Sequence, residues 1–562
     1  MNYTPPISPL GPLWLSALAA LLPLITIFIT LGWLRWKAHW AGLTAVGVAI
    51  LVAVLGWQMQ PILAVLAATQ GAVFGLFPIM WIVFTAILLY QITVVSGRCE
   101  DLRGLFALVS DDPRVQAMLI AFCFGGLLEA LAGFGAPVAI TGVMLMAIGF
   151  SALRAAIVVL VANTAPVAFG AIAIPIITAG NLTKIPYQEI GAYVGHQTPF
   201  LAAFVPLILV LLADGKRGFR QLWPVALITG VAFGVAQWIS ATWLSVELTD
   251  IIASLVGLAA AVGFLRFWKP QGGADALVTL HADRDAELAL MSDKERAALP
   301  QLHETKDTSH LDGGRIFMAL FPYLLVIAVF SVTKLVESIK NWMASTDVKI
   351  KWPGLDGHIL TQSGQPSGST VYTWQWLSSP GTSLLICALI VALVYRVSFK
   401  EVLGEVWGTL FKLRYSILTV ALVLALAYVM NLSGQTITIG TWIAGTGVAF
   451  AFFSPILGWI GTAVTGSDTS ANALFSTLQQ TAGIQAGIDP TLLVAANTSG
   501  GVVGKMISPQ NLTIAATAVG LLGRESDILR KVIWWSIGML VILCLLIGLQ
   551  STPVLSWMLP KF

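Results

Sequence analysis

Long apolar runs recur along the whole chain, and short polar segments separate them. The runs over 12–34 and 534–549, for example, contain no charged residue. A run of about 20 apolar residues can cross a bilayer as a helix, because a helix satisfies its own backbone hydrogen bonds in lipid. The pattern therefore predicts an all-α polytopic membrane protein. About twelve transmembrane helices are expected, near 12–34, 38–57, 74–95, 153–180, 190–212, 222–243, 246–268, 313–336, 381–396, 413–431, 490–514 and 530–552.

Two further apolar segments, at about 113–150 and 449–486, differ from these spans because each has a polar or glycine-rich centre. The first centre reads GFGAP from Gly133, and the second reads GSDTS from Gly466. The arms on either side are too short to form two full spans joined by a loop outside the membrane. Each segment is therefore expected to be a re-entrant hairpin whose tip is buried in protein or lines a wet cavity.

One tripeptide occurs twice. Ala162-Asn163-Thr164 reappears as Ala496-Asn497-Thr498, 334 residues later, and other residues match at the same spacing without a gap: Gly149 with Gly483, Gly170 with Gly504, and Pro175 with Pro509. Small polar residues followed by glycine and proline favour an interrupted helix. Two copies at corresponding places indicate a transporter-like binding site built from broken helices in two internal repeats.

The positions of the basic residues predict the orientation. If the N-terminus faces the periplasm, about 23 of the 30 Lys and Arg residues fall in cytoplasmic loops and roughly six fall outside. The first hairpin then enters from the cytoplasmic side and the second from the periplasmic side, so the two repeats are inverted. The expected parts are an N-terminal membrane half at 1–268, a polar cytoplasmic linker at 269–312 and a C-terminal membrane half at 313–562. Both termini are expected in the periplasm.

Composition agrees with this organisation. The chain is 57% hydrophobic and 10% charged, with a mean hydropathy of +0.86, whereas soluble domains carry about 25% charged residues. The first fourteen residues lack the basic region of a cleaved signal peptide, so the first span is expected to be retained. Nothing in the net charge of +3 suggests nucleic acid. The four cysteines have no metal-binding spacing, no catalytic grouping is recognisable, and we expect neither an enzyme nor a cofactor or metal.

Ionisable residues inside apolar segments are the strongest functional candidates, since each costs a few kcal/mol at the bilayer centre. Asp468 lies in the second hairpin tip among hydroxyl and amide groups, and Glu129 lies on the first hairpin among apolar residues. A partly desolvated carboxyl group of this kind can bind and release a proton as its surroundings change. The alternatives are a helix-capping role for Asp468 and a neutral Glu129 that bonds to a neighbouring helix.

Lys505 follows the glycine-rich segment 500–504. If the helix breaks over 498–501, Lys505 lies within two turns of the break, where freed N–H groups and the cation together attract an anion. The alternative is a structural ion pair with Asp468 or Glu129, which a substrate carboxylate could displace. His196 is a weaker candidate: it is either a proton relay or a core histidine satisfied by a neighbour.

Uncharged polar groups and glycines complete the predicted site. Amides and hydroxyls can hold a carboxylate and a hydroxyl of a substrate, or coordinate a cation. The predicted proton-coupling residues are Asp468, Glu129 and His196. The predicted substrate-binding residues are Asn163, Thr164, Gly133, Gly135, Ser467, Thr469, Asn472, Asn497, Thr498, Ser499 and Lys505.

Four longer strings resemble the L-lactate permease family, which includes the glycolate permeases. They read LLEALAGFGAPVAITG at 127–142, ANTAPVAFG at 162–170, GSDTSANALF at 466–475 and AANTSGGVVGKMISPQ at 495–510. The resemblance implies proton symport of a 2-hydroxymonocarboxylate (L-lactate, D-lactate or glycolate) by alternating access in a bacterial inner membrane. The implied partners are the small hydroxy acid anion, the proton and the lipid bilayer.

In architecture the family looks related to the ion-transporter superfamily, whose sodium–carboxylate symporters place Ser-Asn-Thr at hairpin tips. In this chain the first residue of the tripeptide is alanine, and the tripeptide follows the hairpin. The ligands of those symporters are therefore not carried over. A sodium-coupled carboxylate or anion transporter is the alternative function, and a passive channel is a third.

Overall fold

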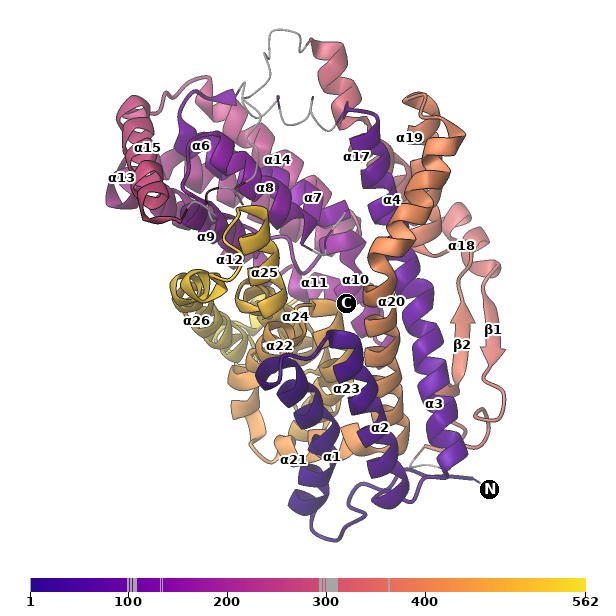
Figure 1. Ribbon diagram of the computed structural model, residues 1–562. Coiled ribbons are helices and arrows are strands. Elements are labelled where there is room, and N and C mark those ends of the chain that lie inside the picture. The colour runs from indigo at the N-terminus through magenta and orange to yellow at the C-terminus, as the bar shows by residue number, and fades with distance from the viewer. Residues whose placement is uncertain are drawn as a thin grey trace.

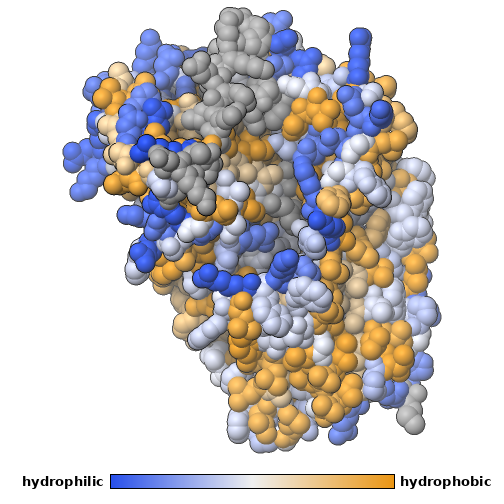
Figure 2. All heavy atoms as spheres, in the orientation of Figure 1, coloured by the Kyte–Doolittle hydropathy of each residue, from blue (hydrophilic) through white to orange (hydrophobic). Residues whose placement is uncertain are grey.

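Helices make up most of the computed structural model (Figure 1). The structure describes residues 2–98, 101, 104, 109–131, 133, 135–292, 296, 299, 312–361 and 364–561. Within these residues, nine helical segments are long and apolar enough to cross a membrane. The chain is therefore a multi-pass membrane protein. Figure 2 shows hydrophobic side chains covering the lower part of one face, over α1, α2 and α21, with hydrophilic side chains gathered above them.

One group of helices packs on the long helix α20 (Phe399–Ser433) or on the neighbours of α20. Small residues allow close approach here: a Cβ added at Gly75 would lie 3.0 Å from the Cα of Ala421. Small residues at helix crossings are the usual means of tight packing in membranes. The other members are α1 (Leu13–Phe28) with η1 (Ile29–Trp33), α2 (Ala38–Leu55), α3 (Pro61–Phe74), η2 (Gly75–Met80), α4 (Trp81–Val95), α17 (Gly313–Leu335) and α19 (Pro380–Val394).

The first predicted hairpin consists of two helical arms around a glycine turn. Asp112 caps the first arm by accepting a hydrogen bond from the backbone N–H of Arg114. Gly135 has a φ of 86°, which glycine adopts without strain, and the return helix begins directly after it. The arms are α6 (Pro113–Met118), η3 (Leu119–Phe124) and α7 (Gly125–Leu131) on one side and α8 (Ala136–Ala147) on the other; α9 (Ala152–Ala162) and α10 (Gly170–Thr183) follow.

The second predicted hairpin has the same design. Gly466, with a φ of 77°, ends its first arm, and the Ser467 hydroxyl caps its second arm by accepting from the N–H of Ser470. The elements of this region are α21 (Gln435–Ala444), η7 (Gly447–Ala449), α22 (Phe450–Thr465), α23 (Asp468–Ala486), α24 (Pro490–Gly504), η8 (Lys505–Ile507), α25 (Pro509–Ala518), α26 (Glu525–Gln550) and η9 (Ser556–Met558).

Helix interruptions recur at matched places in the two halves. In the first half α9 ends before Asn163, and residues 171–173 of α10 adopt left-handed φ angles of 44°, 58° and 57° just before Pro175. In the second half the 3-10 turn η8, residues 505–507, comes just before Pro509. Both interruptions thus precede the prolines that share the 334-residue spacing, as expected of a residue that has no backbone N–H to donate.

Two expectations about helix boundaries are wrong. The second break does not fall at 498–501, because α24 runs without interruption from Pro490 to Gly504. Its glycines serve packing: a Cβ at Gly500 would collide with the backbone of Pro455 on α22. The segment 58–73, which lies between the expected spans 38–57 and 74–95, is largely helix α3.

The N-terminal half closes with α11 (Tyr187–Val194), α12 (Thr198–Ala202), α13 (Val205–Ile239), η4 (Ser240–Leu244) and α14 (Thr249–Leu265). Non-helical angles at Asp214 and Gly215 divide α13 into two segments. The described part of the linker contains α15 (Gly273–Leu290), and most of the linker beyond Ser292 lies outside the described residues. The segment between α17 and α19 contains α18 (Glu337–Ser345), η6 (Gly368–Thr370) and the antiparallel strands β1 (Val348–Lys351) and β2 (Val371–Trp374).

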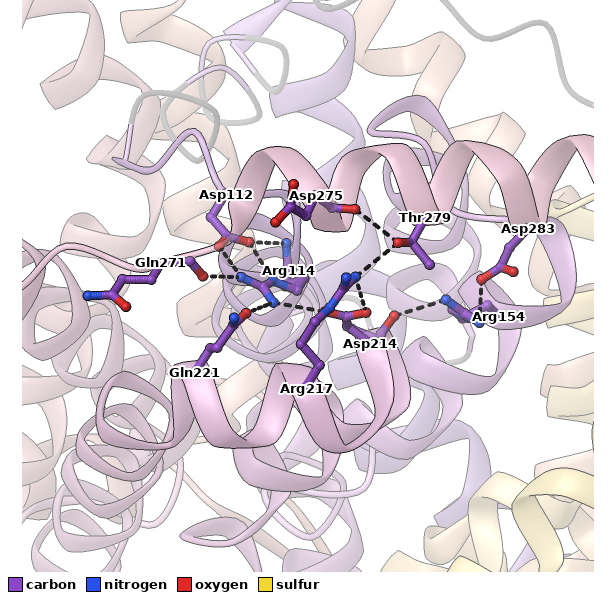
Figure 3. Close-up of polar contacts among 11 residues, drawn as sticks. Asp112, Arg114, Arg154, Asp214, Arg217, Gln221, Gln271, Asp275, Thr279 and Asp283 are labelled. Atoms are coloured by element: carbon purple, nitrogen blue, oxygen red, sulfur yellow. Dashed lines mark hydrogen bonds and ion pairs between the residues drawn. The ribbon is translucent and has the colours of Figure 1, made fainter.

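A network of charged side chains fastens α15 to the first hairpin (Figure 3). At its centre the fully buried guanidinium of Arg114 pairs with Asp112 at 2.7 Å and with Asp214 at 2.8 Å. The same group donates to the backbone carbonyl of Gln271, just before α15. In Figure 1 α15 lies at the top of the molecule and the N-terminus at the bottom. The linker helix and the N-terminus therefore mark opposite ends.

Replacing Arg114 with methionine should destabilise the protein, because the buried Asp112 would lose its cation and Asp214 would keep only its pair with Arg217. Breaking a buried pair typically costs about 3–5 kcal/mol. We expect a clearly lower unfolding temperature of the purified protein in detergent. The matched control is Arg524→Met, since Arg524 forms a half-exposed pair with Asp527 at 3.0 Å and such pairs contribute about 0–1 kcal/mol. Equal unfolding temperatures for the two variants would contradict the assignment.

Candidate functional site

A cavity of about 1300 Å³ opens between the two hairpins and the matched helix interruptions. Six of the predicted site residues line it: Glu129, Gly133, Ser467, Asp468, Thr469 and Lys505. The first interruption contributes Gly170, Ala171, Ile174 and Pro175, and the second contributes Ile507 and Pro509. The cavity thus lies where both halves leave regular helical geometry.

An ion pair between the N-terminal and C-terminal halves lies on the wall of the cavity. The Lys505 ammonium lies 2.5 Å from Oε1 of Glu129, and both side chains are buried. Glu129 comes from the last turn of α7, and Lys505 is the first residue of η8. The second carboxylate oxygen, Oε2, has no hydrogen-bond partner among the described residues. Gly170 makes room for the carboxylate, since a Cβ there would lie 2.9 Å from Oε1.

Asp468 is a second buried carboxylate on the cavity wall. Its Oδ1 accepts a hydrogen bond from the Thr462 hydroxyl at 3.4 Å, and its Oδ2 has no partner within the described part of the chain. The capping of α23 is carried out by Ser467 rather than by Asp468. Asp468 packs directly on α24, where a Cβ at Gly501 would collide with its carboxylate. The capping alternative for Asp468 therefore does not explain this residue.

Four predicted substrate-binding residues of the second half lie behind the cavity rather than in it. The Asn472 amide donates to the Thr498 hydroxyl at 2.9 Å and to the Pro175 carbonyl at 3.1 Å, and Asn472 accepts from the Asn497 amide at 2.9 Å. Ser499 donates to Gln197 at 2.6 Å. These groups satisfy one another, and they join α23 and α24 to the broken helix α10.

The remaining predicted residues also lie outside the cavity lining. Gly135 packs directly beneath it. Gly135 leaves no room for a Cβ beside the side chain of Ile514, a lining residue. Thr164 is buried and donates to the Val161 carbonyl at 2.6 Å, and Asn163 is buried in the turn that ends α9.

His196 lies in a separate apolar pocket with Trp238. Its Nδ1 lies 2.7 Å from the Ala192 carbonyl, and its Nε2 accepts from the Trp238 indole at 2.9 Å. Both ring nitrogens are therefore engaged, as in a satisfied core histidine.

Several cavity residues were missed by the sequence analysis. Polar groups near the ion pair include Thr465, Ser470, Gln510 and Asn511, and the mouth carries Arg35, Lys37, His39, Glu525 and Ser526. Asn511 donates to the backbone carbonyl of Lys505 at 3.2 Å, which steadies the interruption. In the sequence, the only indication of the cavity mouth is the basic pair Arg35 and Lys37 directly after the first expected span.

Comparison with known proteins gives the family. The L-lactate permease family model matches residues 16–554. The chain belongs to the L-lactate permease family. The chain is 42% identical to the L-lactate permease of Bacillus subtilis (strain 168), with all of both chains covered. It is 41% identical to the glycolate permease GlcA of Escherichia coli (strain K12), with 94% of each chain covered, and 38% identical to the L-lactate permease of the same strain, with 98% of each covered.

Membership of the L-lactate permease family confirms the predicted family and the expectation that the chain is a transporter and not an enzyme. The multi-pass architecture agrees with this. Within this L-lactate permease family member, the N-terminal and C-terminal halves meet at the Glu129–Lys505 pair, and Asp468 lies on the wall of the same cavity.

Replacing Gly501 with alanine should impair transport strongly, because the added methyl group would occupy the space of the Asp468 carboxylate. Overpacking a tight contact costs about 1–3 kcal/mol, so we expect uptake to fall by about tenfold or more. The matched control is Gly47→Ala, since Gly47 also lies in a helix but has open space around its Cα. Uptake is measured in cells at equal membrane levels of the two variants. Normal uptake by Gly501→Ala would contradict the proposed packing.

Proposed function

We propose that this chain is a proton-coupled importer of 2-hydroxymonocarboxylates, such as lactate and glycolate, that works by alternating access. The relatives described above include an L-lactate permease and a glycolate permease. These substrates share a carboxylate and a neighbouring hydroxyl, and the charge and the polar groups of the cavity suit both. The membrane is the bacterial inner membrane, and both termini face the periplasm.

The observation that carries the proposal is the Lys505–Glu129 pair on the cavity wall. A substrate carboxylate that binds Lys505 takes the cation away from Glu129. An unpaired carboxylate in this buried position is costly, so Glu129 then binds a proton. Binding of the substrate is thereby coupled to binding of a proton. Moving one anion with one proton is electroneutral, which removes most of the cost of working against the membrane potential.

Asp468 and the hydroxyls beside it complete the binding site. Ser467, Thr469 and Ser470 line the cavity at the start of α23, where backbone N–H groups favour an anion. Asp468 is the second proton-binding group, since its Oδ2 has no partner among the described residues. The buried amides and hydroxyls of Thr164, Asn472, Asn497, Thr498 and Ser499 hold the broken helices in position. The Oδ1 of Asn163 is buried without a partner among the described residues, and His196 has no part in coupling.

Contacts at the two ends of the molecule support inverted repeats. The start of the first hairpin and the start of α9 both bind the linker helix, through Arg114 to Gln271 and through Arg154 to Asp283 at 2.7 Å. The second arm of the second hairpin instead lies near the N-terminus, since Thr477 in the middle of α23 and Pro5 line one small pocket. Hairpins that enter from opposite sides and meet midway are the arrangement of alternating-access carriers. We assign the chain about twelve spans, in membrane halves 1–268 and 313–562 joined by the linker 269–312.

The mouth of the cavity supports an assignment of the conformation in the transport cycle. It is lined by Arg35, Lys37 and His39 from the loop after α1 and by Glu525 and Ser526 from the start of α26. The distribution of basic residues assigns these loops to the cytoplasm. The cavity is then the inward-open form, and its basic mouth draws anions toward the site.

The test uses purified protein in liposomes. A pH gradient, acidic outside, should drive accumulation of labelled lactate, whereas a sodium gradient at equal pH should not. Accumulation driven by sodium alone would replace this proposal with the sodium-coupled alternative. Exchange of labelled for unlabelled lactate in the absence of any gradient separates a carrier from a passive channel.

Replacing Glu129 with glutamine should uncouple the carrier. The neutral side chain resembles the protonated glutamate, so exchange is retained while pH-driven accumulation falls by about tenfold or more. Asp468→Asn is measured beside it, and the variant that keeps exchange but loses accumulation identifies the coupling carboxyl. If both variants accumulate lactate as the wild type does, the assignment of the proton site is wrong.

Replacing Lys505 with methionine should abolish both accumulation and exchange, because the substrate carboxylate loses its cation. Lys340→Met is the matched control, since Lys340 is exposed on α18 and its loss should change neither activity. Binding of lactate to the purified variants is measured directly by calorimetry. Wild-type affinity in Lys505→Met would contradict a direct role for the ammonium group.

A further inference from the structure

A third buried carboxyl group, Asp250, lies next to the site and has no part in the mechanism above. It is in the first turn of α14 and is fully buried. Its Oδ1 accepts a hydrogen bond from the Gln237 amide at 2.9 Å, whereas its Oδ2 has no partner in the described part of the chain. A buried carboxyl group in this setting is stable only if it carries a proton or finds a cation.

Asp250 lies within reach of Glu129. Its helix α14 packs on α7, which carries Glu129 in its last turn. Ser254, one turn after Asp250, touches Gly126 of α7, where an added Cβ would collide with the Ser254 hydroxyl. The two carboxyl groups are close enough to interact electrostatically. Three buried polar atoms of this interface lack partners among the described residues: Glu129 Oε2, Asp250 Oδ2 and Ser254 Oγ.

The residues just before α14 connect Asp250 toward the surface of the protein. Glu247, three residues before Asp250, is buried and accepts hydrogen bonds from the Tyr187 hydroxyl at 2.7 Å and from the Ser245 hydroxyl at 2.8 Å. Tyr187 is half-exposed at the start of α11. Tyr187 thus bonds to Glu247, Glu247 precedes Asp250 by three residues, and Asp250 lies on the helix that packs against α7 with Glu129. These oxygen groups lie on the side opposite to the predicted cytoplasmic mouth.

Other titratable groups near Asp250 are few in the described residues. Of the elements packed on α14, α7 contributes Glu129 and η3 contributes the buried thiol of Cys123. The neighbouring turn of α13 contributes the neutral Gln237, and η4 carries no ionisable side chain. Glu129 is therefore the natural proton acceptor for Asp250.

We propose that Asp250 passes the transported proton to Glu129, an inference that rests on the proton-coupled function proposed above. In the empty site Glu129 is held by Lys505 and accepts no proton. When a substrate carboxylate draws Lys505 away, the O–H bond of Asp250 breaks and a new O–H bond forms at Oε2 of Glu129, directly or through the Ser254 hydroxyl. The Asp250 carboxylate then takes a proton by way of Glu247. Because the transfer waits for substrate, the path conducts no protons through an empty carrier.

The test compares Asp250→Asn with the wild type in liposomes. The variant should retain lactate exchange and lose pH-driven accumulation by about tenfold or more, and lactate-triggered proton uptake, followed with an interior pH dye, should fall equally. Exchange by the variant should also lose its pH dependence. The matched control is Glu189→Gln, which removes a partly exposed carboxylate of the neighbouring α11 and should leave all three measurements unchanged.

The outcomes separate the two proposals. If the wild type shows no pH-driven accumulation, the proposed function fails, whatever Asp250 does. If the wild type accumulates lactate and Asp250→Asn does so equally, the inference about Asp250 is overturned and the proposed function stands. If Asp250→Asn loses exchange as well, Asp250→Glu is measured. Accumulation of lactate by Asp250→Glu would support proton transfer. If Asp250→Glu does not accumulate lactate, Asp250 has a structural role and the inference is overturned.

Discussion

The buried ion pair between Glu129 and Lys505 is the constraint on which the rest of the centre depends. Neither charge is stable alone at this depth, because the cost of an isolated ion in an apolar interior exceeds that of any nearby packing defect. The pair therefore fixes how closely α7 and η8 approach each other. It also accounts for Gly170, where any side chain would displace the carboxylate.

The matched interruptions make room for this pair. A regular helix through residues 171–173 or 505–507 would keep every backbone group bonded within the helix and would leave no cavity between the repeats. The left-handed turn at Ala171 to Ala173 is a strained conformation for three residues that are not glycine. It persists because the neighbouring contacts hold it, among them the hydrogen bond from the Asn472 amide to the Pro175 carbonyl.

Apolar run length, hairpin tips and repeat spacing allowed much of this fold to be predicted from the sequence. Glycine and proline mark the interruptions and tips well, because their backbone chemistry acts locally. The second break was misplaced because Gly500 and Gly501 serve close contacts with α22 and Asp468, and a single sequence does not distinguish a packing glycine from a breaking one. The segment that forms α3 was missed because small and polar residues dilute its hydropathy.

The site was only partly predictable for a similar reason. Glu129, Asp468 and Lys505 stood out as charges among apolar residues, and all three line the cavity. The Asn-Thr pairs stood out equally well, yet neither pair lines the cavity. Asn497 and Thr498 bond to Asn472, and Thr164 bonds to the backbone carbonyl of Val161. Which polar side chain faces open space depends on how distant helices meet. Asp250 was passed over because it lies at the start of a span, where charges are common.

The residues that match at the 334-residue spacing do not include the charged pair. At this spacing, the counterpart of Glu129 is Ala463 and that of Lys505 is Ala171. The N-terminal half thus supplies the acid and the C-terminal half supplies the base of a single charged centre. A chain with one such centre is expected to carry one substrate molecule per turnover, and neither half is expected to transport alone.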